Sequence, residues 1–155
     1  MATPVTPSLR YLIPVLSSTA SVSFAFSEYW TFIPFLRDDI SPQSLVKFCD
    51  SFLYQIIPGW LGFGMTSALA GYLSYRCSNG HSRRLYGWGV VFALAHYAFG
   101  YIEVSQVIEK IAHGLIEGVR DMQRYWLKIH TARTLCSDIP AMIYFIWAFL
   151  HLCMS

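Results

Sequence analysis

Four long apolar stretches constrain this chain more than any other feature of its sequence. A helix needs about 20 mostly apolar residues to cross the hydrocarbon core of a bilayer, and the four stretches reach that length. They lie at about 12–35, 52–75, 85–107 and 135–153. We therefore predict an all-α fold: an integral membrane four-helix transmembrane bundle that forms one domain over residues 1–155.

The composition supports this prediction and excludes some partners. Charged residues make up 13% of the chain, whereas an ordinary soluble domain carries about 25%. The net charge of +2, without a basic run among aromatic residues, argues against a nucleic-acid partner. The N-terminus lacks the pattern of a cleaved signal peptide, so we expect the first stretch to be a retained span. We expect a multi-pass protein in the lipid bilayer of the endoplasmic reticulum or another internal membrane.

The connecting segments contain recognisable helix signals. Ser41-Pro42 is typical of a helix start, and Asn79-Gly80 of a tight turn. Small residues in GWLGFGMTSALAG, within the second stretch, predict close helix contacts. Residues 108–133 are charged but contain no proline, and their apolar residues recur at helical spacing. This pattern predicts an amphipathic helix on the membrane surface, or an extension of the third or fourth span.

The third stretch contains two ionisable residues on one helical face. His96 and Glu103 are seven residues apart, and Gly100 between them leaves room for a ligand or another helix. An ionisable group within a span is costly unless it meets a cavity or a partner. A histidine and a carboxylate in one cavity could act as base and acid, with Tyr97 and Tyr101 bordering the substrate. The alternative is a buried hydrogen-bond network that ties helices together.

A second set of polar residues leads into the fourth stretch. In WLKIHTARTLCSD, one helical face carries Trp126, His130, Arg133 and Ser137, and Asp138 lies a little to the side. Asp138 could pair with Arg133, whose planar guanidinium could stabilise a developing oxyanion. Anchoring at the membrane interface is the alternative for this set.

Glu28, near the end of the first stretch, faces either the same cavity or the membrane interface. The acidic and histidine residues form no pair at metal-ligand spacing, so we predict neither a metal nor another cofactor. An iron or copper site would need His96, His130, Glu28 and Glu103 to converge through tertiary packing.

The motif WLKIHTARTL resembles a pattern in the anthrone oxygenase-like family of small four-span membrane proteins. The resemblance rests on Trp126, Ile129, His130 and Arg133, together with chain length and span layout. The family often has a Pro-Thr-Asn-like element after the third span, where this chain has GYIEVSQVIEK. The resemblance implies an oxidoreductase of secondary-metabolite (aromatic polyketide) biosynthesis. Such a monooxygenase converts an anthrone to an anthraquinone with molecular oxygen and needs no defined cofactor.

This reaction would assign roles to the residues named above. An anthrone has an acidic carbon–hydrogen bond, and its enolate can react directly with oxygen. His96 or His130 would be the base, Glu103 would orient it, and Arg133 would stabilise the enolate. The hydrophobic small-molecule substrate would arrive from the bilayer and contact Glu28, Tyr97, Tyr101, Trp126 and Asp138. The alternatives are a cofactor-free isomerase or cyclase, and a non-catalytic scaffold that binds a pathway enzyme or forms a homo-oligomer.

Overall fold

The computed structural model describes residues 8–112 and 117–154, which fold into helices without a strand. A 3₁₀ turn, Ile33–Leu36, follows the first helix, and a π-helical segment, Thr134–Asp138, precedes the last. The five α-helices are α1 (Leu9–Phe32), α2 (Pro42–Cys77), α3 (Gly80–Ala112), α4 (Val119–Arg133) and α5 (Ile139–Met154).

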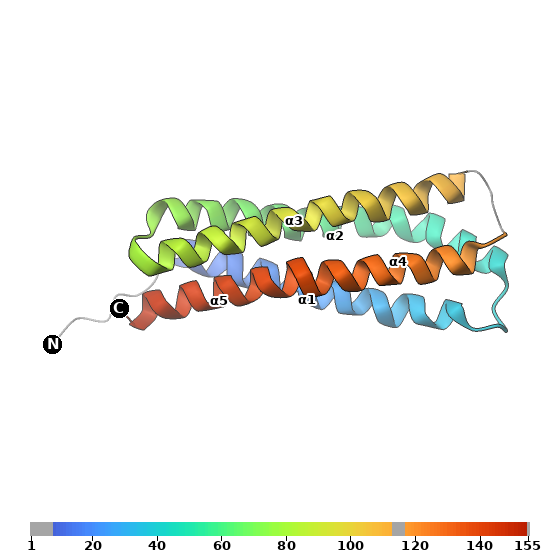
Figure 1. Cartoon of the computed structure of the whole chain (residues 1–155), viewed down its shortest axis with the longest axis horizontal. Coiled ribbons are helices and arrows are strands. Elements are labelled where there is room, and N and C mark those ends of the chain that lie inside the picture. The colour runs from blue at the N-terminus through green and yellow to red at the C-terminus, as the bar shows by residue number, and fades with distance from the viewer. Residues whose placement is uncertain (1–7, 113–116, 155) are drawn as a thin grey trace.

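The helices form four long antiparallel rods, because α4, the π-helical segment and α5 run on as one rod (Figure 1). In Figure 1, α1 begins and α5 ends at the same end of the bundle. The predicted all-α bundle is thus confirmed for the described residues. In the predicted charged stretch 108–133, residues 108–112 end α3 and Val119–Arg133 forms α4, which continues into the last rod. The described parts therefore extend the third and fourth rods, which is one of the two alternatives. Leu115 of that stretch lies outside the described residues.

Three segments are long and apolar enough to cross a membrane: Leu9–Leu36, Gly80–Glu103 and Val119–Met154. The second rod adds a fourth only if Pro42–Phe52 and Ile57–Cys77, which are inclined by 48°, count as one span. Pro58 lies just after this bend and has no N–H for the carbonyl of Tyr54, one turn earlier. The sequence did not predict a bend, since proline is also tolerated in straight spans.

The predicted helix start at Ser41-Pro42 and the predicted turn at Asn79-Gly80 are both confirmed. The Ser41 side chain accepts a hydrogen bond from the Ser44 N–H, and Pro42 is the first residue of α2. The turn between α2 and α3 ends at Gly80, whose φ of 58° is in the left-handed region that favours glycine. These signals fix where the second and third rods begin.

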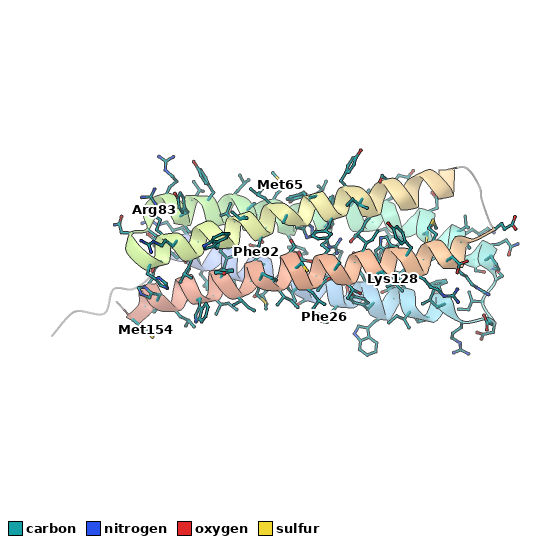
Figure 2. The ribbon with its side chains drawn as sticks, viewed as in Figure 1. Phe26, Met65, Arg83, Phe92, Lys128 and Met154 are labelled. Carbon is teal, nitrogen blue, oxygen red and sulfur yellow. The ribbon has the colours of Figure 1, made fainter. Side chains whose placement is uncertain are left out.

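The outer surface of the bundle is strongly apolar. Figure 2 shows side chains that project outward along its length, including Phe26 and Met65. Several large apolar residues are more than half exposed, among them Leu16, Leu69, Leu73, Trp88, Leu94 and Trp147. Monomeric soluble proteins rarely expose such contiguous apolar surface.

Glycine allows the rods to approach closely near the chain termini. The Phe145 ring is fully buried against Gly71 and Gly89. A Cβ on Gly71 would lie 2.6 Å from this ring, and one on Gly89 would lie 2.5 Å from it. The predicted role of the small residues in α2 is therefore confirmed, and α3 and α5 take part in the same contact.

This contact predicts opposite effects of alanine at two helical glycines. Gly89→Ala should lower the free energy of unfolding by about 1–3 kcal/mol, because the added methyl overpacks against Phe145. Gly62→Ala should be neutral or stabilising by up to about 1 kcal/mol, since nothing lies within 4 Å of its Cβ position. Unfolding of both variants in detergent would measure the difference, and equal stability would contradict the packing described.

Candidate functional site

Six ionisable side chains meet in the interior of the bundle, and we call them the buried charge cluster. They come from three of the four rods, and each side chain is at most 6% exposed. Its members are Glu28, His96, Glu103, His130, Arg133 and Asp138. All four residues predicted to be catalytic therefore converge, together with Glu28 and Asp138.

Helical periodicity places most of these residues on inward stripes. In α1 the buried stripe contains Ser18, Ala25 and Glu28. In α3 the corresponding stripe carries His96 and Glu103 two turns apart. Small neighbours on each stripe allow the rods to approach, so the charged groups of different helices come within contact distance.

Asp138 reaches the cluster because the helix widens just before it. The Ile139 N–H donates to the Thr134 carbonyl, five residues earlier, instead of four. Pro140 follows and has no N–H for the carbonyl of Cys136, which explains why regular helical bonding fails here. In a regular α-helix, Asp138 would lie about 140° around the axis from Arg133. The wider turn instead buries both Ser137 and Asp138, so Asp138 does not stay to the side, as the sequence suggested.

Arg133 is the centre of the buried charge cluster. Its Nη1 lies 2.6 Å from Glu103 Oε2, and its Nη2 lies 3.2 Å from Glu28 Oε2. Its Nε lies 3.5 Å from Asp138 Oδ2, as the sequence analysis expected for this pair. One planar guanidinium thus contacts three carboxyl groups from three elements, which an ammonium point charge could not do with the same geometry.

His130 is enclosed on all sides. Its Nε2 lies 3.0 Å from the Ala25 carbonyl oxygen, which can only accept a hydrogen bond, so Nε2 carries a proton. Its Nδ1 lies 2.9 Å from Arg133 Nη2 and 3.1 Å from Glu28 Oε2. Nδ1 can accept from the guanidinium or donate to the carboxylate, but it cannot do both. The Trp126 ring stacks on the imidazole at 4.8 Å, so His130 has no atom left for a substrate.

His96 differs because one of its nitrogens has no partner. Its Nδ1 lies 2.6 Å from Asp138 Oδ1, and an ionised carboxylate can only accept, so Nδ1 donates. Its buried Nε2 has no hydrogen-bond partner among the described residues. The Trp60 ring stacks on the imidazole with centroids 5.4 Å apart, and its indole fills the room that Gly100 leaves.

A small cavity adjoins this histidine. Its volume is about 10 Å³, which is close to the space that one water occupies. It is lined by His96, Asp138, Gly64 and the serines Ser18, Ser21 and Ser67. His96 and three serines of α1 and α2 therefore line the same cavity.

The charge count of the cluster implies stored protons. Three carboxyl groups share one guanidinium and two imidazoles. Because a net charge in a low-dielectric interior is costly, an electrically neutral cluster holds two protons beyond those of Arg133 and of two neutral imidazoles. An ionised Asp138 beside a neutral His96 leaves Glu28, Glu103 and His130 as the groups that can hold them.

Several predicted side-chain partners differ from those in the structure. Glu103 pairs with Arg133, and it is Asp138 that orients His96. Tyr97 borders His96, with ring centroids 5.3 Å apart, and its hydroxyl donates to the Leu61 carbonyl.

Tyr101 is 75% exposed and lies outside the cluster, because five residues place it about 140° from His96 on the helix. Trp126 contacts the His130 ring and Phe32, where it holds the imidazole in place.

Three features of the site were not predicted from the sequence. Trp60 stacks on His96, and Tyr29 makes an edge contact with His130 while its hydroxyl donates to Thr131. The third is the cavity lining by serines of α1 and α2. The serine-rich first stretch was a visible signal, but it equally suited helix packing. Nothing in one sequence showed which aromatic residues face inward.

No group of three or more His, Cys, Asp or Glu side chains in the described part of the chain is arranged to hold a metal ion. Comparisons of the chain with protein-family models, with curated proteins and with solved structures give no match. The resemblance to the anthrone oxygenase-like family therefore stays a prediction, and the function has to be argued from the site itself.

The contacts of Arg133 predict a large effect on stability. Arg133→Ala should lower the free energy of unfolding by about 3–5 kcal/mol, because it leaves buried carboxylates without a counter-charge. The control is Arg124→Ala on the same helix, whose partner Asp121 is 81% exposed and whose loss should cost less than about 1 kcal/mol. Unfolding in detergent measures both, and a loss for Arg133→Ala no larger than the control would contradict the central role of this residue.

Proposed function

We propose that this chain is a multi-pass membrane enzyme that removes a proton from an apolar aromatic substrate and oxidises it with molecular oxygen. The observation that carries the proposal is the His96–Asp138 pair, because His96 Nε2 has no hydrogen-bond partner among the described residues and His96 lines a small cavity. An anthrone-type compound of an aromatic polyketide pathway is the proposed substrate, in line with the family resemblance.

The proposed membrane location rests on the two surfaces of the bundle. The outside carries many exposed apolar side chains, and exposed ion pairs such as Arg37–Asp39 and Arg124–Asp121 lie at the end where α2 and α4 begin, whereas the charged groups of the middle are paired in the interior. This inversion is what a bilayer requires, because polar groups within it must be satisfied internally. We propose four spans, with the bent second rod counted as one, and an internal membrane such as the endoplasmic reticulum.

His96 is the proposed base. A carboxylate that binds one imidazole nitrogen fixes the tautomer and leaves the other nitrogen as a proton acceptor. Asp138 does this through its 2.6 Å contact with Nδ1, and its other oxygen lies 3.5 Å from Arg133 Nε in an ion pair without a hydrogen bond. His130 shares the cluster but offers no free nitrogen. Of the two histidines that the sequence allowed as base, the geometry favours His96.

The proposed reaction balances without a further redox partner. His96 Nε2 takes a proton from the acidic carbon, and the resulting carbanion adds to oxygen to form a carbon–oxygen bond. Protonation gives a hydroperoxide. Loss of the second proton from the same carbon breaks the oxygen–oxygen bond and yields a carbonyl and water. The substrate supplies all the electrons, so one oxygen atom ends in the product and the other in water.

The remaining members of the cluster supply and receive protons in this scheme. Two nitrogens of the Arg133 guanidinium donate to Glu103 and Glu28, and its Nε lies 3.5 Å from Asp138 Oδ2 without a hydrogen bond. We therefore assign it a positioning role in place of direct contact with the enolate. We assign proton exchange to Glu28, Glu103 and His130, because His130 Nδ1 lies 3.1 Å from Glu28 Oε2 and 3.9 Å from Glu103 Oε1. This reservoir also suits an isomerase or cyclase that returns the proton to another carbon, which is the second candidate function.

Oxygen consumption by membranes that contain the protein tests the proposal. With a simple anthrone supplied, uptake should depend on the protein and yield a quinone. His96→Gln and Asp138→Asn should each reduce the rate by about 10²–10⁴-fold, because general-base catalysis contributes that much.

The matched control is His151→Gln, since His151 bonds Ser82 and lies outside the buried charge cluster. This variant should keep the wild-type rate. If the anthrone disappears without oxygen uptake, the isomerase or cyclase is the better account. If His96→Gln keeps the full rate of oxygen uptake, the assigned base is wrong.

A further inference from the structure

A large apolar groove lies between α1 and α2 on the outer side of the bundle. Its volume is about 590 Å³, within the roughly 300–1,000 Å³ of typical small-molecule sites. Its apolar lining includes Ile13, Leu16, Ala20, Pro58 and Phe63. Leu16 is 58% exposed, so the groove opens toward the surface that we propose faces the bilayer.

The floor of this groove is formed by glycine. Gly59 and Gly62 line it, and nothing lies within 4 Å of a Cβ position on Gly62. The open position at Gly62 suits a flat molecule that lies against the helix, whereas the Phe24 ring lies 3.2 Å from a Cβ position on Gly59. The described lining includes two hydroxyls, those of Ser17 and Thr66, and no charged side chain. The groove therefore suits a planar, mostly apolar compound with few oxygen atoms.

The groove adjoins the cavity beside His96. Ser17 lines the groove, Ser67 lines the cavity, and their hydroxyl oxygens are 3.0 Å apart. Both serines are buried, and both also hydrogen-bond to carbonyls of their own helices. Each hydroxyl can donate to the carbonyl of its own helix. Loss of the Ser17–Ser67 hydrogen bond therefore leaves neither donor without an acceptor.

A second groove offers less to a reacting molecule. It lies between α1 and the last rod, has a volume of about 380 Å³, and is lined in part by Tyr29, Thr131 and Leu135. Tyr29 separates it from His130, whose two nitrogens already have partners. Of these two grooves, the α1–α2 groove is the one that adjoins a histidine whose Nε2 has no hydrogen-bond partner among the described residues.

We propose that the α1–α2 groove is the substrate site, and that a planar, mostly apolar compound enters it sideways from the bilayer. The substrate displaces the Ser17–Ser67 hydrogen bond, and its acidic carbon then approaches Nε2 of His96. The hydroxyls of Ser18, Ser21 and Ser67 are placed to bind its oxygen. This inference rests on the proposed function and specifies the route and the class of substrate.

Photolabelling with benzophenone, an apolar aromatic ketone, tests the site independently of turnover. Protein in lipid nanodiscs is irradiated with the probe, and labelled peptides are identified by mass spectrometry. We expect labels on α1 and α2 residues of the groove, such as Leu16 and Phe63, and protection by excess anthraquinone. Labelling confined to Tyr29, Leu135 and their neighbours in the second groove would overturn the inference.

Gly62→Leu fills the groove without a clash, since its Cβ position is open, and should abolish the protected labelling. The matched control is Leu69→Trp, which adds bulk to an outward position of the same helix and should leave labelling unchanged. Equal thermal unfolding of the two variants verifies that both fold. Protected labelling that survives Gly62→Leu would also overturn the inference.

Turnover of an anthrone by the same variants separates this inference from the proposed function. Groove labelling that Gly62→Leu abolishes, without turnover in the wild type, would support the site and reject the reaction. Turnover that Gly62→Leu leaves intact would support the reaction and reject the site. Loss of both labelling and turnover in Gly62→Leu alone is the result that we expect.

Discussion

The contact of one guanidinium with three carboxyl groups is the interaction on which the rest of this structure depends. Arg133 binds Glu28 of α1, Glu103 of α3 and Asp138 of the π-helical segment, so it joins three rods at one point in the interior. Without it, buried carboxylates would face each other in a medium that screens charge poorly. The same contact holds Asp138, which orients His96, so stability and the proposed chemistry share one residue.

The environments of the two histidines give them different roles. His130 is clamped between a carbonyl, a guanidinium and a tryptophan ring, and we assign it to the proton reservoir. His96 has one nitrogen bound by a carboxylate and one without a partner, and it borders a hydroxyl-lined cavity. Small residues of α1 and α2 make that cavity and the adjoining groove. Close packing of the helices and access to the base therefore depend on the same glycines and serines.

Much of this arrangement could be predicted from sequence, and the limits have physical causes. Long apolar blocks predicted the rods, and spacings of three, four and seven residues placed His96, Glu103, His130 and Arg133 on inward faces. Spacing fixes the face of a helix, but it does not fix which residue of another helix is met. Glu103 was therefore matched with His96, although it pairs with Arg133. Asp138 needed a widened turn whose one sequence signal was Pro140, and a charged helix such as α4 suits a membrane surface as well as a bundle.

The most direct test of the account is the position of the proton on His96. Nitrogen-15 NMR of histidine-labelled protein in detergent can resolve the two ring nitrogens, and His96→Gln assigns the signal. The account predicts that Nδ1 carries the proton, bound to Asp138, and that Nε2 is unprotonated. Addition of an apolar aromatic ketone should then perturb the Nε2 signal most. A proton on Nε2, with Nδ1 accepting from a neutral Asp138, would contradict the account, because His96 would have no free site to act as a base.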